Sequence, residues 1–478
     1  MTKPEEKLAP SARTAPNQLA EQLDASPAET LALAILWSAR EPQRVGEVAL
    51  LLPRTPVWLF GRDPERPLSG PAEPSEPAEP TEPRTGLDED PFALPSARSP
   101  SAPAVGIVRF VRQRPDGVEP AREPLPILGE SISRLQLRMS YRDKDLFVHN
   151  VGRCQLLVNG RPTQSAVVSH GDTLYLRNQL LLMCVRRPLQ LPPLRAYPRD
   201  RVREFGAPDA DGMIGESPAM WHLRERLAAC ARGAQNVLII GESGSGKELA
   251  AQAIHSLSSR RSKPLVTDNI SAIPPSLAAA LLFGNKKNFP NPGMEERVGL
   301  IGAADGSMLF LDEIGDMPAE VQPMFLRVTE RGGEYFRLGE ESRPRRSSFR
   351  LVGATNRPEQ MRYELKRRFQ REIRVPGLEQ RCEDIPLLIR QLLIVQARSD
   401  LIDAARFVRR GQPRVHPQLI DQLLRHKYTT HISEISFLLG QAMAESAHDV
   451  LMPLGAAHTG ATHAAQDEPA ARPGPRLV

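Results

Sequence analysis

The stretch NVLIIGESGSGKELAAQAIH, residues 236–255, decides the fold class of this chain. A short apolar run enters a glycine-rich turn, and a helical pattern begins at Lys247. Gly241, Gly244 and Gly246 permit a close backbone approach that side chains would block, so successive N–H groups can surround phosphate oxygens. Because Lys247 adds positive charge, the stretch predicts a phosphate-binding loop in an α/β domain. The alternative is a strand–turn–helix that merely uses glycine.

A second stretch, GSMLFLDEIGDMP at 306–318, supplies acidic groups. Its apolar strand delivers Asp312 and Glu313 to the end of the strand where open α/β sheets place ligands. Asp312 is expected to hold Mg²⁺ through water, and Glu313 to polarise the attacking water. Asp312 could instead simply cap the next helix. Downstream of a phosphate loop, however, the pair indicates ATP and Mg²⁺ as cofactors. The residues expected to bind the nucleotide in the loop are Gly241, Glu242, Ser243, Gly244, Ser245, Gly246, Lys247 and Glu248.

Composition bounds the class of protein. The hydrophobic fraction is 40%, and the 46 prolines concentrate in the N-terminal third, which indicates that part of the chain is not packed. A net charge of +5 over 478 residues does not demand a nucleic-acid partner. The four cysteines form no CxxC pair, which argues against a disulfide framework and a zinc site. With no signal-like start and no membrane-length apolar run, we expect a cytoplasmic protein with no membrane partner.

Changes in the hydrophobic pattern along the chain predict a multidomain architecture. Short apolar runs separated by turn signals predict an N-terminal β-sandwich, and alternating strands and helices that follow predict a parallel α/β ATPase. A purely helical pattern then predicts a lid. The expected boundaries are a disordered tail at 1–29, the sandwich at 30–187 with an acidic Pro-rich insertion at about 64–104, a linker at 188–213, the ATPase subdomain at 214–376, the lid at 377–452 and a disordered tail at 453–478.

Several motifs occur in a fixed order, among them IGESPAM, GESGSGKELAAQAIH, LFLDEIGDMP, GEYFRLG, LVGATNRP and RCEDIPLL. This series resembles the AAA+ central domain of bacterial enhancer-binding proteins, the sigma-54-dependent transcription activators, over about 214–447. In that family Glu replaces the Ser or Thr that usually follows the phosphate-loop lysine, so Glu248 supports the resemblance.

The resemblance implies roles for residues outside the two motifs. Asn269 matches the asparagine that switches the orientation of the catalytic Glu, and Thr355 with Asn356 matches the first sensor of the γ-phosphate. Arg362 and Arg368 resemble arginine fingers that reach the ATP of the next subunit, with Arg368 the better match. Their alternative is an ordinary charged helix face. A finger supplied in trans implies a hexameric or heptameric ring.

Two departures from the family pattern bear on function. The second sensor, normally Arg, falls on Ser433, which removes a cation expected near the γ-phosphate. The family's LFGHEKGAFTGA, whose Phe-Thr tip engages sigma-54, reads LFGNKKNFPNPG here, with Phe289 still nearby. The altered loop at 284–293 argues against direct remodelling of sigma-54, while an RNA polymerase sigma factor stays open as a partner.

The N-terminal region resembles a forkhead-associated (FHA) domain, a β-sandwich that binds phosphothreonine peptides. The matching traces are FGRD, ISR and LLVNG. Arg62, Ser133 and Arg134 would then contact the phosphate of a phosphothreonine protein. The alternative is a purely structural sandwich, because the SRxH and Asn-Gly-Thr elements of that family are not matched.

These expectations combine into two hypotheses. The leading one is an ATP-hydrolysing AAA+ regulator of the sigma-54-activator type, controlled by an FHA-like sensor. The alternative is a non-hydrolysing, ATP-bound signalling adaptor that binds phosphorylated partners. The C-terminal segment shows no helix-turn-helix pattern, so we expect no sequence-specific DNA binding by this chain alone.

Overall fold

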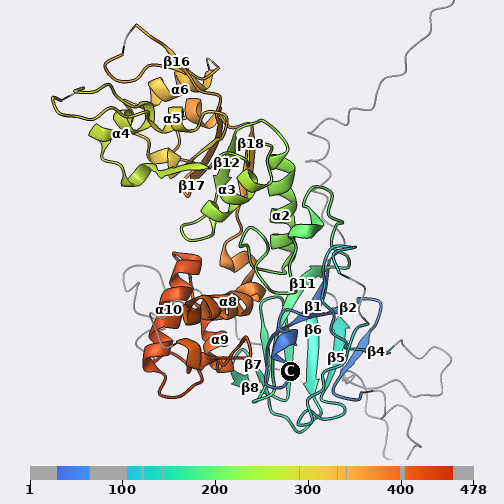
Figure 1. The fold of residues 1–478 in the computed structure, drawn as a ribbon. Coiled ribbons are helices and arrows are strands. Elements are labelled where there is room, and N and C mark those ends of the chain that lie inside the picture. Colours follow the sequence, from blue (N-terminus) through green and yellow to red (C-terminus); the bar gives the residue numbers. More distant parts are fainter. Residues whose placement is uncertain are drawn as a thin grey trace, which may run out of the picture.

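The computed structural model describes residues 29–64, 105–119, 123–142, 145–289, 291–330, 332–340, 342–398 and 404–455. The expected tails and the expected Pro-rich insertion lie almost wholly outside these ranges. Three parts follow one another along the chain: an N-terminal module up to Pro188, an α/β core at 214–376, called the ATPase core after the activity predicted for it, and a helical lid at 377–455. The ATPase core occupies one end of the molecule, while the lid and the N-terminal module lie side by side at the other (Figure 1).

The N-terminal module consists of two β-sheets that share one hydrophobic core. In order across the first sheet, the strands are β2 (Val48–Leu51), β1 (Glu29–Ser38), β11 (Leu180–Pro188), β10 (Thr173–Leu176), β7 (Leu156–Val158) and β8 (Arg161–Pro162). Across the second they are β4 (Val105–Ile107), β3 (Val57–Phe60), β5 (Leu137–Arg142), β6 (Asp145–Asn150) and β9 (Ser165–Val168). Every pairing is antiparallel except that of β3 with β4.

Strands β1 and β11 are buried on both faces. Leu33 and Leu182 point into the core of the module, as alternate residues of a strand should. Their neighbours Ala34 and Met183 point the other way and join a second core made with the lid helices. The strands therefore read as nearly continuous apolar runs, a pattern typical of strands covered on both sides.

The ATPase core is built on a parallel five-stranded sheet. Its strands, in spatial order, are β13 (Val266–Asn269), β14 (Met308–Asp312), β17 (Arg350–Thr355), β12 (Val237–Ile240) and β18 (Arg371–Arg374). The helices are α2 (Pro218–Ala231), α3 (Lys247–Ser256), α4 (Pro275–Phe283), α5 (Leu300–Ala303), α6 (Gln322–Glu330) and α7 (Tyr363–Lys366), with a small hairpin of β15 (Glu334–Tyr335) and β16 (Arg345–Arg346).

Alternation along the central strands divides their side chains between two cores. Val237 and Ile239 pack with α2 and α3, while Leu238 and Ile240 pack with α4 and α6. Because all five strands run in the same direction, their carboxyl ends meet at one edge of the sheet. That edge receives the phosphate loop after β12 and the acidic pair after β14.

The lid consists of α8 (Ile385–Arg398), α9 (Pro417–Arg425) and α10 (His431–Glu445), with a hairpin of β19 (Val408–Arg409) and β20 (Gln412–Pro413). Its core is continuous with the outer face of β1 and β11. Polar contacts reinforce this junction: the guanidinium of Arg187 lies 3.1 Å from the Glu383 carboxylate, and the Thr173 hydroxyl donates to Asp421 at 3.0 Å. The lid is thus packed against the N-terminal module (Figure 1). No helix among the described residues is both long and apolar enough to cross a bilayer.

Candidate nucleotide site

The phosphate loop joins β12 to α3, as the sequence predicts. Gly244 and Gly246 have φ values of +71° and +105°, in the left-handed region where side chains are strained. A Cβ at Gly246 would meet nothing within 4 Å, so the loop is open on that side. The Ser245 hydroxyl is buried with no hydrogen-bond partner among the described atoms. An open backbone concavity with an unsatisfied hydroxyl beside it fits a bound phosphate.

Lys247 begins α3 and is only 6% exposed. Its Nζ lies 3.3 Å from Glu313 Oε1 and donates to the Glu242 carbonyl at 3.3 Å. A buried ammonium needs an anionic partner. In this structure that partner is the predicted catalytic carboxylate, and phosphate oxygens would offer the same charge in the same place. The next residue, Glu248, is exposed and accepts a hydrogen bond from Gln252 on the same helix.

Glu313 has a strained backbone, with φ +47° and ψ +46° at the end of β14. Left-handed conformations of non-glycine residues gather at functional sites. Its Oε2 accepts a hydrogen bond from the Asn356 N–H at 3.2 Å, while its own N–H donates to Asp312 Oδ1 at 3.0 Å. The carboxylate is therefore held between Lys247 and the first-sensor position.

The predicted switch and sensor residues lie on strands that flank β14. Asn269 pairs in register with Asp312, and its side-chain oxygen accepts hydrogen bonds from the N–H and hydroxyl of Ser271. Thr355 is buried at the end of β17, where its carbonyl accepts the Gly241 N–H. Asn269 is thus adjacent to the acidic pair but engaged with Ser271 rather than Glu313.

These residues fit ATP with Mg²⁺. Lys247 and the loop N–H groups offer positive potential at one edge of the sheet, and the half-buried Asp312 carboxylate offers the oxygen ligands that Mg²⁺ prefers. When bound, Mg²⁺ would supply charge neutralisation on the phosphates.

The first turn of α10 packs directly on the phosphate loop. A Cβ added to Gly244 would lie 2.0 Å from the Thr430 carbonyl oxygen, and the Ile432 N–H donates to the Gly244 carbonyl at 3.2 Å. Ser433, the second-sensor position, lies at the same contact, with its hydroxyl oxygen 3.2 Å from that added Cβ. The lid therefore reaches the loop with a short hydroxyl where the family pattern has arginine.

His431 forms a second link between lid and loop that the sequence did not reveal. It is fully buried, and its Nε2 lies 2.6 Å from Glu242 Oε2. The Leu378 N–H donates to Nδ1 at 3.3 Å, so Nδ1 is an acceptor and Nε2 carries the proton that is donated to Glu242. Glu379 lies on the Nδ1 side, 3.9 Å away. One ligand atom from each of Glu242, Glu379 and His431 lies within 4.8 Å of the others, so the three residues form an acidic cluster around the imidazole.

Arg381, in the RCEDIPLL motif, is another group at the loop that sequence reasoning did not single out. Its side chain is buried, its Nη2 donates to the Ser245 carbonyl at 3.3 Å and its Nη1 to the Ile214 carbonyl. Burial lowers the pKa of its guanidinium. Arg381 thus brings a cation from the start of the lid to the phosphate loop, although it holds backbone carbonyls there.

The two predicted arginine fingers lie beside α7. Arg362 is the exposed residue that precedes the helix, and Arg368 is half-buried just after it. The Arg368 carbonyl accepts a hydrogen bond from Asn236, directly before β12. Both arginines belong to the segment that links the first sensor to β18.

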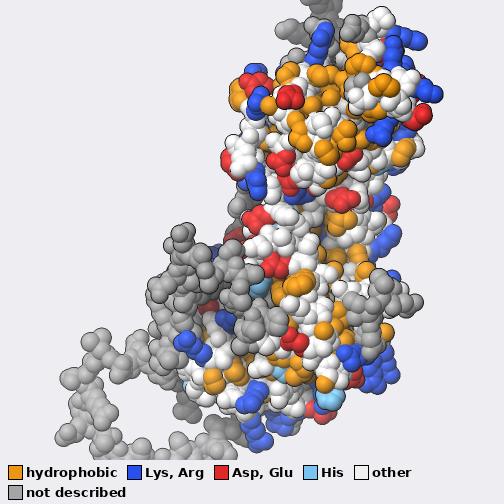
Figure 2. Space-filling view, turned by 90° about the vertical axis from the view of Figure 1, so that its left-hand side faces the viewer, with side chains coloured by type: hydrophobic (Ala, Val, Ile, Leu, Met, Phe, Trp, Pro, Cys, Tyr) orange, Lys and Arg blue, Asp and Glu red, His pale blue; other side chains and the backbone are white. Residues whose placement is uncertain are grey.

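The loop at 284–299 projects from the end of α4 and is held at its base. Asn285 and Arg297 exchange backbone hydrogen bonds of 3.1 Å, and Lys286 N–H donates to the Leu338 carbonyl. The Phe289 ring lies over Gly339, where an added Cβ would be 2.7 Å from Phe289 Cγ. Figure 2 shows hydrophobic side chains gathered at this end of the ATPase core, where the exposed large ones are Leu277, Phe289, Val298, Met324 and Phe336.

The three predicted phosphopeptide residues lie together in the N-terminal module. The Arg62 N–H donates to the Ser133 carbonyl, and the Asp63 N–H donates to the Arg134 carbonyl, both at 3.2 Å. Arg62 and Arg134 are exposed. The exposed Arg153, which the sequence did not indicate, donates its N–H to the Ser133 hydroxyl at 2.9 Å.

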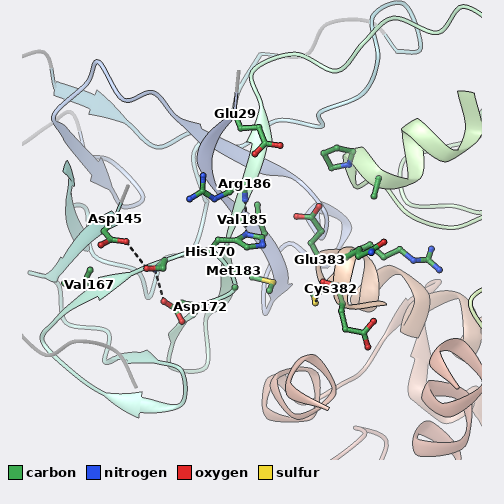
Figure 3. A pocket seen from close by; sticks show the side chains of 17 residues that line it. Glu29, Asp145, Val167, His170, Asp172, Met183, Val185, Arg186, Cys382 and Glu383 are labelled. Atoms are coloured by element: carbon green, nitrogen blue, oxygen red, sulfur yellow. Dashed lines mark hydrogen bonds between the residues drawn. The ribbon is translucent and has the colours of Figure 1, made fainter. Parts of the chain in front are cut away.

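A cavity of about 890 Å³ lies between the N-terminal module and the start of the lid (Figure 3). Asp145 and Asp172 line the module side, both hydrogen-bonded to Ser169. Glu383 enters from the lid, and burial raises the pKa of its carboxyl to about 7 in spite of the Arg187 charge beside it. The Glu383 carboxyl is thus a titratable group set into the junction, away from the phosphate loop.

The parallel sheet, the glycine loop before α3 and the acidic pair after β14 form the arrangement of a P-loop nucleotide-binding domain. The family model described as the sigma-54 interaction domain matches residues 213–374. Over this domain the chain is similar to sigma-54-dependent transcriptional regulators.

The chain is also similar to curated transcriptional regulators. The transcriptional regulator NtrC of Rhizobium meliloti is 33% identical over 268 residues, which are 54% of this chain and 53% of that protein. The regulator VasH of Vibrio cholerae is 44% identical over 184 residues, 37% of this chain and 34% of VasH. This chain therefore spans about half the length of NtrC and a third of VasH. A crystal structure of NtrX from Brucella abortus in complex with ADP shows 29% identity and a TM-score of 0.45, covering 51% of this chain and 55% of that one.

Proposed function

We propose that this chain is a transcriptional regulator of the sigma-54-activator type that binds and hydrolyses ATP in a ring of its own copies. The observation that carries the proposal is the convergence of Lys247, Glu313 and Asn356 at one edge of the sheet. Lys247 and the loop N–H groups would bind the phosphates, Asp312 would hold Mg²⁺, and Glu313 would orient and polarise the attacking water.

Glu313→Gln tests this assignment directly. Gln keeps the size of the side chain and its acceptor for the Asn356 N–H, but loses the charge that polarises water. We expect ATP binding to persist and steady-state hydrolysis to fall by at least about a hundredfold, the usual contribution of a positioned base. Lys247→Ala should abolish binding as well. Hydrolysis that survives in Glu313→Gln would contradict the catalytic assignment.

Ring assembly is tested by the dependence of turnover on protein concentration. An arginine finger supplied in trans acts across a subunit boundary, so ATPase activity per chain should rise with assembly. Arg368→Ala mixed with Glu313→Gln should recover part of the activity, because each mutant supplies the group that the other lacks. Tight ATP binding with no turnover at any concentration would favour the non-hydrolysing adaptor.

The loop at 284–299 bears on the partner. Pairing with Leu338 and packing of Phe289 on Gly339 hold its base and one aromatic ring at an apolar end of the ATPase core. We expect this end to contact the protein that the ATPase acts upon. Capture of sigma-54 holoenzyme in the presence of a γ-phosphate analogue would establish sigma-54 as that partner in spite of the altered tip, and failure of capture would point to another.

A second activity is favoured by the cluster around Ser133. We propose that the N-terminal module is FHA-like and binds a phosphothreonine peptide through Arg62, Ser133 and Arg134. The backbone bonds between 62–63 and 133–134 support this, because they hold the three residues next to one another while Arg62 and Arg134 stay exposed. A phosphothreonine peptide library should bind the full chain, and Arg62→Ala should abolish that binding. Equal binding of unphosphorylated peptides would leave the module a structural role.

A further inference from the structure

A second cavity, of about 590 Å³, lies on another side of the same junction. One wall is the end of β1 and the turn after it, and the other is the start of α8 with the β19–β20 hairpin. We call it the junction pocket. Its lining residues are Leu36, Trp37, Ser38, Ala39, Arg40, Pro42, Gln43, Val45, Pro386, Ile389, Arg390, Arg409, Arg410, Gln412, Pro413, Arg414, Val415, Ile420 and Val450.

The charge of the junction pocket is one-sided. Five arginines line it, and its described lining contains no Asp or Glu. Arg414 is neutralised by Asp449, and Arg390 donates to the Gly206 carbonyl. The side chains of Arg40, Arg409 and Arg410 are exposed and make no hydrogen bond or ion pair with any residue that the structure describes. Unpaired guanidinium groups converging on a concave surface are an anion-binding arrangement, and their fork geometry suits phosphate oxygens.

The backbone at Arg410 is strained. Arg410 and Gly411 have φ values of +51° and +72° and form the two-residue turn between β19 and β20. Such turns favour Asn-Gly or Gly-Gly, and a left-handed arginine costs about 1–2 kcal/mol. The hairpin thus keeps a cation at the rim of the pocket, whereas an unstrained Asn-Gly or Gly-Gly turn would have none. A strained backbone of this kind often accompanies function.

The floor of the junction pocket is apolar and holds an aromatic ring. Trp37 is half-buried there, and its indole N–H donates to the Val415 carbonyl at 3.0 Å, which ties the ring across the junction. Ile389 and Ile420 lie on the lid side. A ligand that satisfies both parts of the pocket has a phosphate and a flat, weakly polar group that can stack on indole.

We propose that the junction pocket binds a small phosphate ester of the nucleotide type, at a site separate from the phosphate loop. The arginines at the rim hold the phosphate, and the base lies on the apolar floor against Trp37. Because one wall belongs to the N-terminal module and the other to the lid, the ligand bridges the two parts and reinforces their docking. It thereby acts on the element that carries Thr430 and His431 to the phosphate loop.

The test uses the full chain carrying Lys247→Ala, so that binding at the phosphate loop does not contribute. AMP and GMP are titrated by calorimetry and by tryptophan fluorescence. Trp58 and Trp221 are buried whereas Trp37 lines the pocket, so quenching reports on Trp37. We expect one saturable site for at least one nucleotide, and at least tenfold weaker binding of pyrophosphate and of adenosine, each of which has half of the recognised chemistry.

Matched variants make the result specific. Arg409→Ala and Arg410→Gly should each weaken binding at least tenfold, and Arg410→Gly relaxes the turn, so its loss of binding cannot come from unfolding. Arg54→Ala removes an exposed arginine on the β2–β3 turn outside the pocket and should change nothing. Absence of saturable nucleotide binding, or binding unchanged in Arg409→Ala and Arg410→Gly, overturns the proposal. Binding of a synthetic acidic peptide of sequence PAEPSEPAEPTEP in preference to both nucleotides overturns it as well.

Discussion

Glu383 makes the stability of the junction depend on pH. Its Oε1 lies 3.1 Å from the Arg187 guanidinium, and its Oε2 is buried with no hydrogen-bond partner among the described atoms. Burial raises the pKa of Glu383 from its ordinary value of 4.5 to about 7, and the neighbouring Asp384 charge acts in the same direction. The folded chain therefore holds the Glu383 proton more tightly than the unfolded chain does.

The sign and size of the effect follow from this shift. A carboxyl whose pKa is raised on folding contributes stability that is fully present below pH 4.5 and is lost as pH rises through about 7. Each pKa unit corresponds to about 1.4 kcal/mol, so the whole contribution is about 3 kcal/mol. The wild-type chain should lose this amount between pH 4.5 and pH values above 7.

Glu383→Gln removes the titration while keeping a neutral side chain of the same length. Unfolding of the full chain in urea is measured at half-unit steps from about pH 4.5 to 8. The free energy of unfolding of the variant, relative to wild type, should rise by up to about 3 kcal/mol across this range. Glu334→Gln, at an exposed glutamate on β15, should run parallel to wild type throughout. Parallel curves for Glu383→Gln would refute the account of a proton held at the junction.

Three further substitutions test contacts described above. His431→Ala removes the hydrogen bonds to Glu242 and Leu378 and should loosen the lid. The loosening should appear as a higher KM for ATP and faster proteolysis before α10. His431→Asn should retain most activity, because asparagine tolerates the φ of +46° at this position. Gly339→Ala should displace Phe289 and raise hydrogen exchange in 284–289, while Gly293→Ala, with open space around its Cβ position, should show only the backbone strain of φ +90°. Val185→Asp buries a charge on the lid-facing side of β11 and should separate the lid from the module at a cost of several kcal/mol. Val185→Ala should keep the two parts docked, and protease cleavage of the 188–213 linker measures the difference. Equal cleavage in both variants would contradict this packing.

Local patterns predicted the glycine turn before α3 and the strand that ends at Asp312, and the structure contains both. The glycine spacing around Lys247 and the apolar strand before Asp312 are each dictated within one short segment, so the sequence alone indicates both the turn and the strand end. Their approach in space follows from the rule that parallel strands deliver ligand groups to one edge. The left-handed backbone of Glu313 carried no such signal, because its strain depends on contacts outside the segment.

Long-range packing was the part that the sequence analysis missed. His431 reaches Glu242 across 189 positions, and nothing near either residue announces the pair. The docking of the lid on the module does correspond to a visible feature of the sequence. LALAILW and LLLMCV are continuous apolar runs, whereas a strand with one solvent face alternates. That pattern is typical of strands covered on both faces, although it does not say which part of the chain covers the second face.

The shared core of β1, β11 and the lid helices changes which parts of the chain are expected to move together. The sequence pattern predicts the boundary at the 188–213 linker, between the N-terminal module and the ATPase region with its lid. By packing, the boundary falls between the α/β core and a body composed of the lid and the N-terminal module together. If the lid rotates during nucleotide turnover, the N-terminal module should therefore rotate with it as one rigid body. Deletion of the first 187 residues would remove the module side of this shared core and expose Leu388, Ile389 and their apolar neighbours on the lid.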